Sequence, residues 1–180
     1  MEKRKILVLI DVQNDFITGS LENNEAQAAI PAIVEKIKNF DGEQIILTKD
    51  THHDEYINTK EGQKLPVVHC IEGTDGWEIQ KDVHAAVHAK GIPVTTFNKP
   101  TFGSLSMARY LDGLEGELDI EVCGFCTDIC VVSNALLLKA KLYEKANITV
   151  DASCCAGVTP ETHKAALATM KMCQINVINE

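Results

Sequence analysis

The amino-acid sequence predicts an α/β protein, a three-layer sandwich in which helices cover both faces of a parallel sheet of about six strands. Two observations lead to this fold class. Six short runs rich in β-branched residues are almost continuously apolar, as strands covered on both faces are, whereas strands with one wet face alternate. Amphipathic segments separate these runs, which indicates β-α-β connections.

The predicted elements follow one another along the whole chain. The strands are expected at Ile6–Val12, Gln44–Thr48, Ile92–Phe97, Leu118–Cys123, Ile148–Asp151 and Gln174–Ile178. The helices are expected at Glu25–Phe40, Glu78–Lys90, Ser104–Leu111, Asp128–Tyr143 and Pro160–Met172. The last helix has an N-cap residue in Thr159 and proline at its first position, both of which favour a helix start.

Length and composition bound the kind of protein. A chain of 180 residues suits a single domain, expected over residues 1–180. Its formal net charge of −9 and the lack of a basic stripe argue against nucleic acid as a partner. The apolar run behind the N-terminus is broken at Asp11, too early for a secretory signal or a membrane span, so we expect a cytoplasmic protein without a membrane partner.

The cysteines do not form a disulfide pattern. Seven cysteines is an odd number in a chain without an export signal. Cys123 and Cys126 form a C-x-x-C pair, which leaves a redox pair or half of a structural zinc site as an alternative. Cys123 lies inside a predicted strand, however, and no second C-x-x-C occurs.

Cys130 is the strongest candidate for a reactive group. It follows the predicted strand Leu118–Cys123 and lies in the first turn of the predicted helix Asp128–Tyr143. Unpaired N–H groups and the helix dipole at such a position favour thiolate over thiol. The backbone N–H groups of Cys126 and Cys130 are also suited to bind an oxyanion.

Four chemically active side chains follow four predicted strands. Asp11 follows the first, Asp50 the second, Lys99 the third and Cys130 the fourth. Ligands of open parallel sheets bind beyond the carboxyl ends of the strands. We therefore expect these residues to meet in one site, where Asp11 can take the thiol proton and Lys99 can stabilise charge.

The long polar connection from Lys49 to Trp77 predicts a functional loop. It carries carboxylates and imidazoles, with the pair Asp50-x-His52 at its start and Glu61 and His69 further along. These are ligand types for a divalent transition metal ion.

Three motifs together resemble the isochorismatase-like cysteine hydrolases, the superfamily that includes the nicotinamidases. They are Ile10-Asp11-Val12-Gln13-Asn14-Asp15-Phe16, Phe97-Asn98-Lys99 and Gly124-Phe125-Cys126-Thr127-Asp128-Ile129-Cys130-Val131. The resemblance covers essentially the whole chain, with the motifs in the expected order. It implies catalytic roles for Asp11, Lys99 and Cys130, and a cis peptide bond between Phe125 and Cys126.

The resemblance also implies a metal site and a ring pocket. The metal ligands would be Asp50, His52, Glu61 and His69, with His53 an alternative third ligand, and the ion would be zinc, iron or manganese. Phe16, Leu65 and Pro66 would line the ring pocket. Pro66 stands where nicotinamidases often carry tryptophan, which leaves the exact amide open.

The expected function is hydrolysis of a small carboxamide through a thioester, with nicotinamide to nicotinic acid and ammonia as the leading case. A cysteine hydrolase acting on another small amide or ureido compound is the second possibility, and a non-catalytic metal- or ligand-binding protein of the same fold is the third. Isochorismate is a weaker candidate, because its hydrolysis does not need the thiol of Cys130. The resemblance to this superfamily further implies a homo-oligomer.

Overall fold

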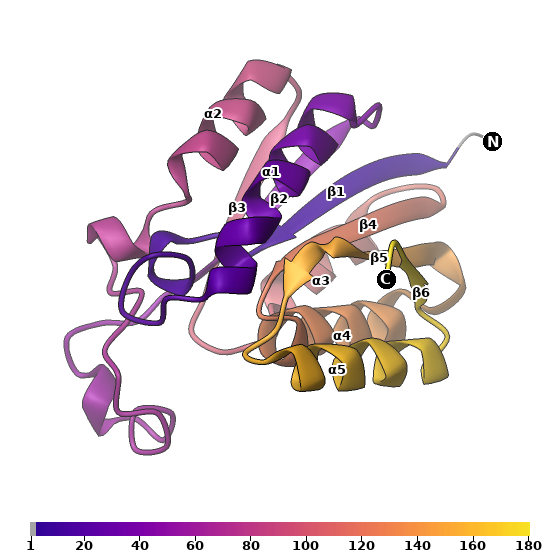
Figure 1. Cartoon of the computed structure of the whole chain (residues 1–180). Helices are drawn as coiled ribbons and strands as arrows, with labels where there is room; N and C mark the ends of the chain where they lie inside the picture. Colours follow the sequence, from indigo (N-terminus) through magenta and orange to yellow (C-terminus); the bar gives the residue numbers. More distant parts are fainter. Residues whose placement is uncertain (1–2) are drawn as a thin grey trace.

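The computed structural model describes residues 3–180, so Met1 and Glu2 of the predicted domain lie outside the described residues. One parallel sheet forms the middle layer (Figure 1). Its strands are β1 (Arg4–Ile10), β2 (Gln44–Asp50), β3 (Val94–Lys99), β4 (Leu118–Phe125), β5 (Ala146–Ala156) and β6 (Asn176–Ile178). They lie in the order β3-β2-β1-β4-β5-β6. The predicted fold class is confirmed.

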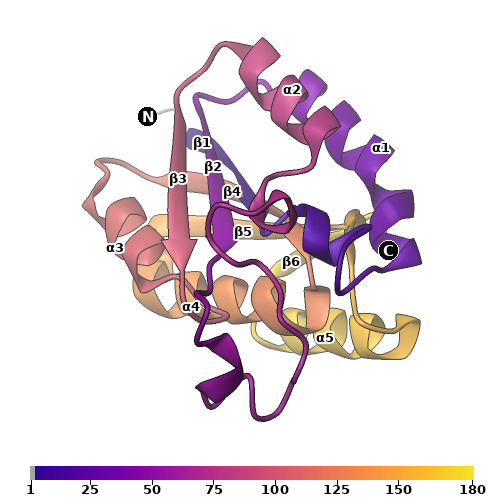
Figure 2. The same cartoon turned by 90° about the vertical axis from the view of Figure 1, so that its left-hand side faces the viewer.

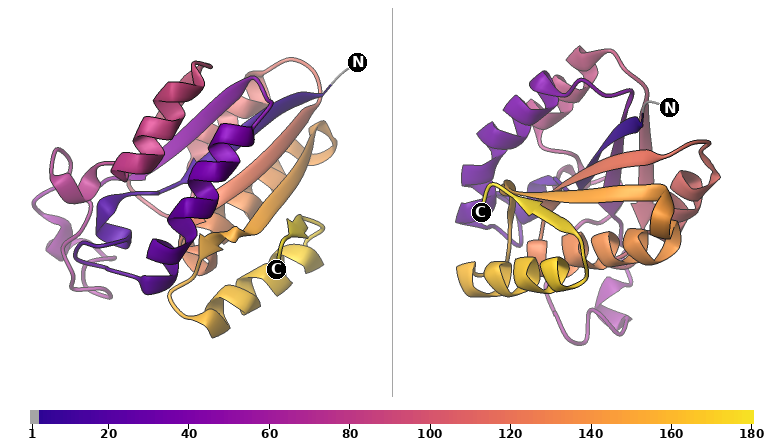
Figure 3. Two further views of the ribbon diagram at one scale, coloured as in Figure 1. Left: turned by 45° about the horizontal axis from the view of Figure 1, so that its top comes forward. Right: turned by 90° about the vertical axis from the view of Figure 1, so that its right-hand side faces the viewer.

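Five α-helices in the described chain form the outer layers: α1 (Asn24–Asn39), α2 (Lys81–Lys90), α3 (Leu105–Gly113), α4 (Val132–Leu142) and α5 (Pro160–Met172). Helices α1 and α2 cover one face of the sheet, and α3, α4 and α5 cover the other (Figure 3). No helix within residues 3–180 is both long and apolar enough to cross a membrane.

The central strand β1 shows why the predicted strands are continuously apolar. Ile6, Val8 and Ile10 pack in the core beneath α3, α4 and α5, whereas Leu7 and Leu9 pack in the core beneath α1 and α2. All five side chains are fully buried. Because successive strand residues point to opposite faces, a strand between two helix layers must be apolar at every position.

Several element boundaries differ from the prediction, and two of these differences lie at the carboxyl end of the sheet. Strand β5 was expected over Ile148–Asp151 but spans Ala146–Ala156, because its end continues to pair with β4, where Cys155 is the partner of Gly124 and Ala156 the partner of Phe125. The helix expected at Asp128–Tyr143 begins as a π-helical turn, Thr127–Val131, and becomes α-helical only at Val132. Hydrophobic periodicity does not distinguish these helix types over one turn.

The close approach of β1 and β4 fixes the end of the sheet where the candidate site lies. Ile10 and Gly124 are partners in the pairing of these strands. Gly124 has a φ of 121°, and a Cβ added there would lie 2.0 Å from the carbonyl oxygen of Ile10. Only glycine therefore fits beside the residue that precedes Asp11.

Gly124→Ala is expected to lower the free energy of unfolding by about 3 kcal/mol or more, because the methyl group meets backbone and the φ is strained. Gly113→Ala is the matched control, since the added Cβ meets nothing within 4 Å, and it should change stability by less than about 1 kcal/mol. Chemical denaturation of both variants checks this. Equal stabilities would contradict the packing described here.

Candidate active site

The carboxyl ends of four strands bring the predicted residues together. Asp11 follows β1, Asp50 and Lys99 are the last residues of β2 and β3, and Cys130 lies in the π-helical turn after β4. Figure 2 shows β3 running to the end of the sheet where the loop after β2 projects. Side chains far apart in the sequence thus share one edge of the sheet, as predicted.

Lys99 is the centre of this arrangement. Its Nζ lies 2.6 Å from Oδ2 of Asp11, 3.5 Å from Sγ of Cys130 and 3.5 Å from Oδ1 of Asp50. Asp11 is 0% exposed and Lys99 1% exposed. A cation buried to this extent requires partners of opposite charge, and both carboxylates supply them.

The ionisation of Cys130 differs from the prediction. Burial raises the pKa of this thiol well above its ordinary value, and the charge of Asp11 raises it further, while Lys99 opposes both. The prediction from the helix start, a lowered pKa, is wrong for this structure, because loss of hydration outweighs a helix terminus and one cation. Burial likewise raises the pKa of Asp11, against the lowering effect of Lys99.

The turn that carries Cys130 is held by a buried asparagine that the sequence analysis did not single out. Nδ2 of Asn134 donates to the carbonyl of Cys130 at 2.8 Å and to that of Phe102 at 2.9 Å, and its Oδ1 accepts from the N–H of Ser104. This amide therefore joins the Cys130 turn to the loop after β3. The peptide bond between Phe125 and Cys126, at the entry to the turn, is cis, as the family resemblance implied.

The four predicted metal ligands form one cluster. The ligand atoms of Asp50, His52, Glu61 and His69 all lie within 4.8 Å of one another. Nε2 of His52 lies 3.1 Å from Oδ2 of Asp50, and Nε2 of His69 lies 3.4 Å from the same oxygen. His53, the alternative ligand, lies outside the cluster, since its ring faces Glu72 at 3.7 Å and is 60% exposed.

The surroundings of the cluster suit a divalent cation. Nδ1 of His69 lies 2.8 Å from the carbonyl oxygen of Val67 and donates to it, which leaves Nε2 free to bind a metal, as in many histidine sites. Although burial alone would raise the pKa of Asp50, the neighbouring His52 and His69 and the charge of Lys99 hold it below its ordinary value. Burial and the charge of Asp50 raise the pKa of Glu61, which reflects carboxylates gathered close together.

Two further residues of the first motif support this cluster, and the sequence analysis did not assign them that role. The side chain of Gln13 is fully buried. Its Nε2 donates to the carbonyls of Asp50 and Trp77, both at 2.9 Å, and its Oε1 accepts from the N–H of Asp50 at 2.7 Å. Oδ2 of Asp15 accepts from the N–H of Cys70 at 2.7 Å. In the sequence, the polar residues Asp11, Gln13 and Asp15 occupy every second position, and this spacing could have indicated their supporting role.

A cavity of about 420 Å³ opens over these groups. Asp50, Glu61, His69, Cys126 and Cys130 line it together with two of the predicted pocket residues, Phe16 and Leu65. Pro66, the third, is exposed and does not line the cavity. The N–H of Val67 bonds to the carbonyl of Leu65 at 2.8 Å, so the chain turns tightly there and Pro66 lies on the outside of the turn.

Comparisons with known proteins agree with this architecture. The family model for the isochorismatase domain matches residues 5–179. A Mycobacterium tuberculosis protein named nicotinamidase/pyrazinamidase is 26% identical, over 97% of this chain and 98% of that protein.

Solved structures show the same fold. The Bacillus subtilis nicotinamidase/pyrazinamidase superposes with a TM-score of 0.80 at 24% identity, covering 98% of this chain and 100% of that one. The pyrazinamidase of Pyrococcus horikoshii, solved in complex with zinc, gives 0.76 at 24% identity, covering 98% and 99%.

Gln13→Glu is expected to lower the free energy of unfolding by about 3 kcal/mol, because a buried carboxylate would face two carbonyl oxygens. The N–H of Asp50 should exchange with solvent faster, which hydrogen exchange measures. Gln27→Glu is the control: this exposed side chain also donates to one carbonyl, that of Ile17, and its loss should cost less than about 1 kcal/mol. Similar stability of the two variants would rule out a bracing role for Gln13.

Proposed function

The chain belongs to the isochorismatase family, and on this basis we propose that it is a cysteine amidohydrolase that converts nicotinamide to nicotinic acid and ammonia. The observation that carries the proposal is Lys99, whose Nζ lies within 3.5 Å of both Asp11 and Cys130 beneath a cavity that also holds the carboxylate–imidazole cluster. The name of the M. tuberculosis relative supports the substrate.

The first half of the reaction makes the thioester. The thiol of Cys130 gives its proton to Asp11 as its sulfur attacks the carbonyl carbon of the amide. The oxygen of the tetrahedral intermediate accepts from the backbone N–H groups of Cys126 and Cys130. Asp11 then gives the proton to the leaving nitrogen, the C–N bond breaks, and ammonia departs.

The second half restores the enzyme. Asp11 takes a proton from a water molecule, whose oxygen attacks the thioester carbon, and the C–S bond breaks to give nicotinic acid. The sulfur takes the proton back from Asp11. Lys99 stays charged throughout, because the charges of Asp11, Cys130 and Asp50 raise its pKa although burial would lower it. It therefore offsets the negative charge whether Asp11 or Cys130 carries it.

The carboxylate–imidazole cluster fits one divalent ion, zinc, iron or manganese, held by Asp50, His52, Glu61 and His69. Two imidazoles and two carboxylates are a common ligand set for these metals, and the zinc in the P. horikoshii structure agrees with it. The ion would supply a Lewis acid to which the pyridine nitrogen of the substrate binds.

A non-catalytic binder of the same fold is the weaker proposal. Burial of Lys99 and Asp11 beside a thiol removes two charges from water, which is costly and serves no purpose in a protein that only binds. The cytoplasmic location and the homo-oligomer expected from the sequence stay predictions.

Cys130→Ala is expected to lower kcat for ammonia release from nicotinamide by about three orders of magnitude or more, because the covalent intermediate is lost. The unfolding temperature should hardly change, since one buried sulfur is removed. Cys126→Ala is the matched control: it also lines the cavity but contributes only its backbone N–H, so kcat should stay within about tenfold. Undiminished turnover by the Cys130 variant would refute the mechanism.

Elemental analysis should find close to one divalent metal per chain, and His52→Ala or His69→Ala should remove it. KM for nicotinamide should then rise at least about tenfold, while Cys130 stays open to alkylation in a Cys173→Ser background, which removes the exposed thiol. His53→Ala should leave metal content unchanged, because this ring is outside the cluster. Full activity without metal would exclude the anchoring role.

A further inference from the structure

The cavity extends well beyond the reacting groups. Its volume of about 420 Å³ falls in the range of cavities that enclose drug-sized ligands. A single pyridine ring with a carboxamide is much smaller than such a ligand. The proposed substrate therefore leaves part of this cavity unfilled.

The remaining wall is apolar, and every loop at this end of the first five strands contributes to it. Leu21 comes from the segment after β1, Leu65 from the loop after β2, Phe102 from the loop after β3, Ile129 from the turn after β4 and Val158 from the loop after β5. Five separate segments thus place one large apolar side chain each around one opening, which we call the apolar mouth. Such convergence is typical of a ligand-binding surface.

Three members of the apolar mouth are exposed to water. Leu65 is 37% exposed, Phe102 39% and Val158 56%. Clustered apolar side chains in contact with water mark a surface that a ligand covers. An apolar group seated there would release water from all three side chains.

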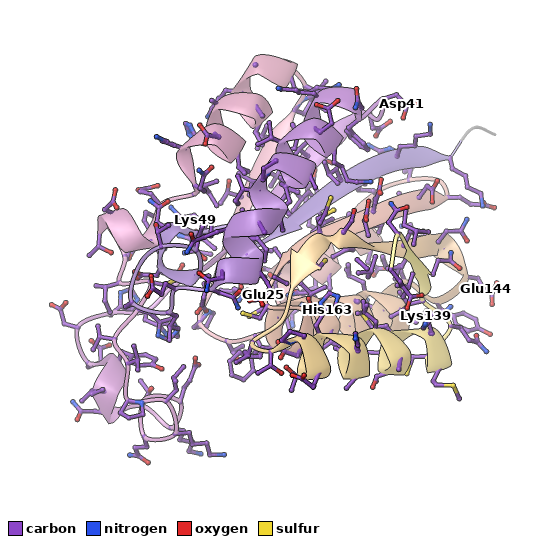
Figure 4. All side chains as sticks on the ribbon, in the orientation of Figure 1. Glu25, Asp41, Lys49, Lys139, Glu144 and His163 are labelled. Carbon is purple, nitrogen blue, oxygen red and sulfur yellow. The ribbon has the colours of Figure 1, made fainter. Side chains whose placement is uncertain are left out.

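The charges around the cavity exclude an acidic ligand. No described residue that lines it is a lysine or an arginine, whereas Glu22, which stands outside the proposed metal cluster, is among them. Asp50 and Glu61 also line the cavity, but the proposed metal ion would offset their charges. Lys99 is buried and paired with Asp11. Lys49, labelled in Figure 4, is bound to Glu78 and lies over the ring of Trp77. An anionic substituent would meet Glu22 and find no free cation to pair with it.

We propose that the apolar mouth is a substrate subsite, and that the enzyme acts on uncharged ring carboxamides bearing an apolar substituent. This inference rests on the proposed amide hydrolysis. The ring nitrogen and the carboxamide, which are both anchored, flank carbon 2 of nicotinamide. Carbon 5 lies opposite carbon 2 and is the ring atom furthest from both anchors. An alkyl group on carbon 5 therefore extends toward the mouth.

The test compares nicotinamide with its 5-methyl, 5-ethyl and 5-propyl derivatives, and with the 5-carboxylate. Across the alkyl series kcat/KM should rise about fourfold for each carbon, the factor that ~0.8 kcal/mol per buried methylene gives. The 5-carboxylate should be at least about tenfold poorer than nicotinamide. If nicotinamide is hydrolysed but the alkyl series is flat or declines, the subsite is refuted while the hydrolase proposal stands.

Calorimetric binding to Cys130→Ala decides the subsite independently of turnover. Kd should fall along the alkyl series by the same factor, and a constant Kd would overturn the proposal even if no amide were hydrolysed. If the native protein hydrolysed no amide at all, only the proposed function would be refuted.

Variants of the apolar mouth locate the effect. Phe102→Ala and, separately, Val158→Ser should each reduce the ratio of kcat/KM for the 5-propyl compound over nicotinamide several-fold. Met172→Ala is the control, because this side chain is apolar and 84% exposed but does not line the cavity; it should leave the ratio unchanged. An unchanged ratio in both mouth variants would show that the alkyl group binds elsewhere.

Discussion

The buried ammonium of Lys99 is the interaction on which the rest of the site depends. It contacts Asp11 at 2.6 Å, and at 3.5 Å it reaches both Cys130 and Asp50. Taking this charge out of water costs several kcal/mol, so both carboxylates must stay ionised or share protons around it. One cation thereby links the proposed nucleophile to the proposed metal cluster through Asp50.

The parallel sheet makes this coupling possible. Strands β3, β2, β1 and β4 are neighbours in that order, so their carboxyl ends set Lys99, Asp50, Asp11 and the Cys130 turn side by side. Hydrogen bonds between neighbouring side chains then orient the residues of the site. Thr48 donates to Oδ1 of Asp11 at 2.6 Å, and Gln13 ties the backbone of Asp50 to the segment after β1. The strands thus place the residues of the site near one another, and hydrogen bonds from buried polar side chains hold them in position.

Much of this site was predictable from the sequence, because residue type and place at a strand end are local properties. The meeting of Asp11, Lys99 and Cys130, the grouping of the four proposed metal ligands and the fold class followed from them. The outward turn at Pro66, the bracing by Gln13 and Asn134 and the π-helical turn at Thr127–Val131 did not. The bonds of Gln13 and Asn134 reach segments far away in the sequence, which no local pattern encodes. The Pro66 turn and the π-helical turn rest on local backbone bonds, Val67 to Leu65 and Val131 to Cys126, which hydrophobic periodicity does not reveal. The length of β5 depends on its pairing with β4, which is not a local property.

The pKa of Cys130 shows how tertiary structure changes a correct local argument. A helix start favours thiolate, yet burial and Asp11 keep the thiol neutral. In the proposed mechanism a low pKa is not needed, because the proton moves to Asp11 and not to water. Thiol with carboxylate and thiolate with carboxylic acid carry the same total charge beside Lys99, so the transfer adds no buried charge. Burial raises the pKa of both members of this pair, so in the proposed mechanism the proton passes between two groups that both favour their protonated form.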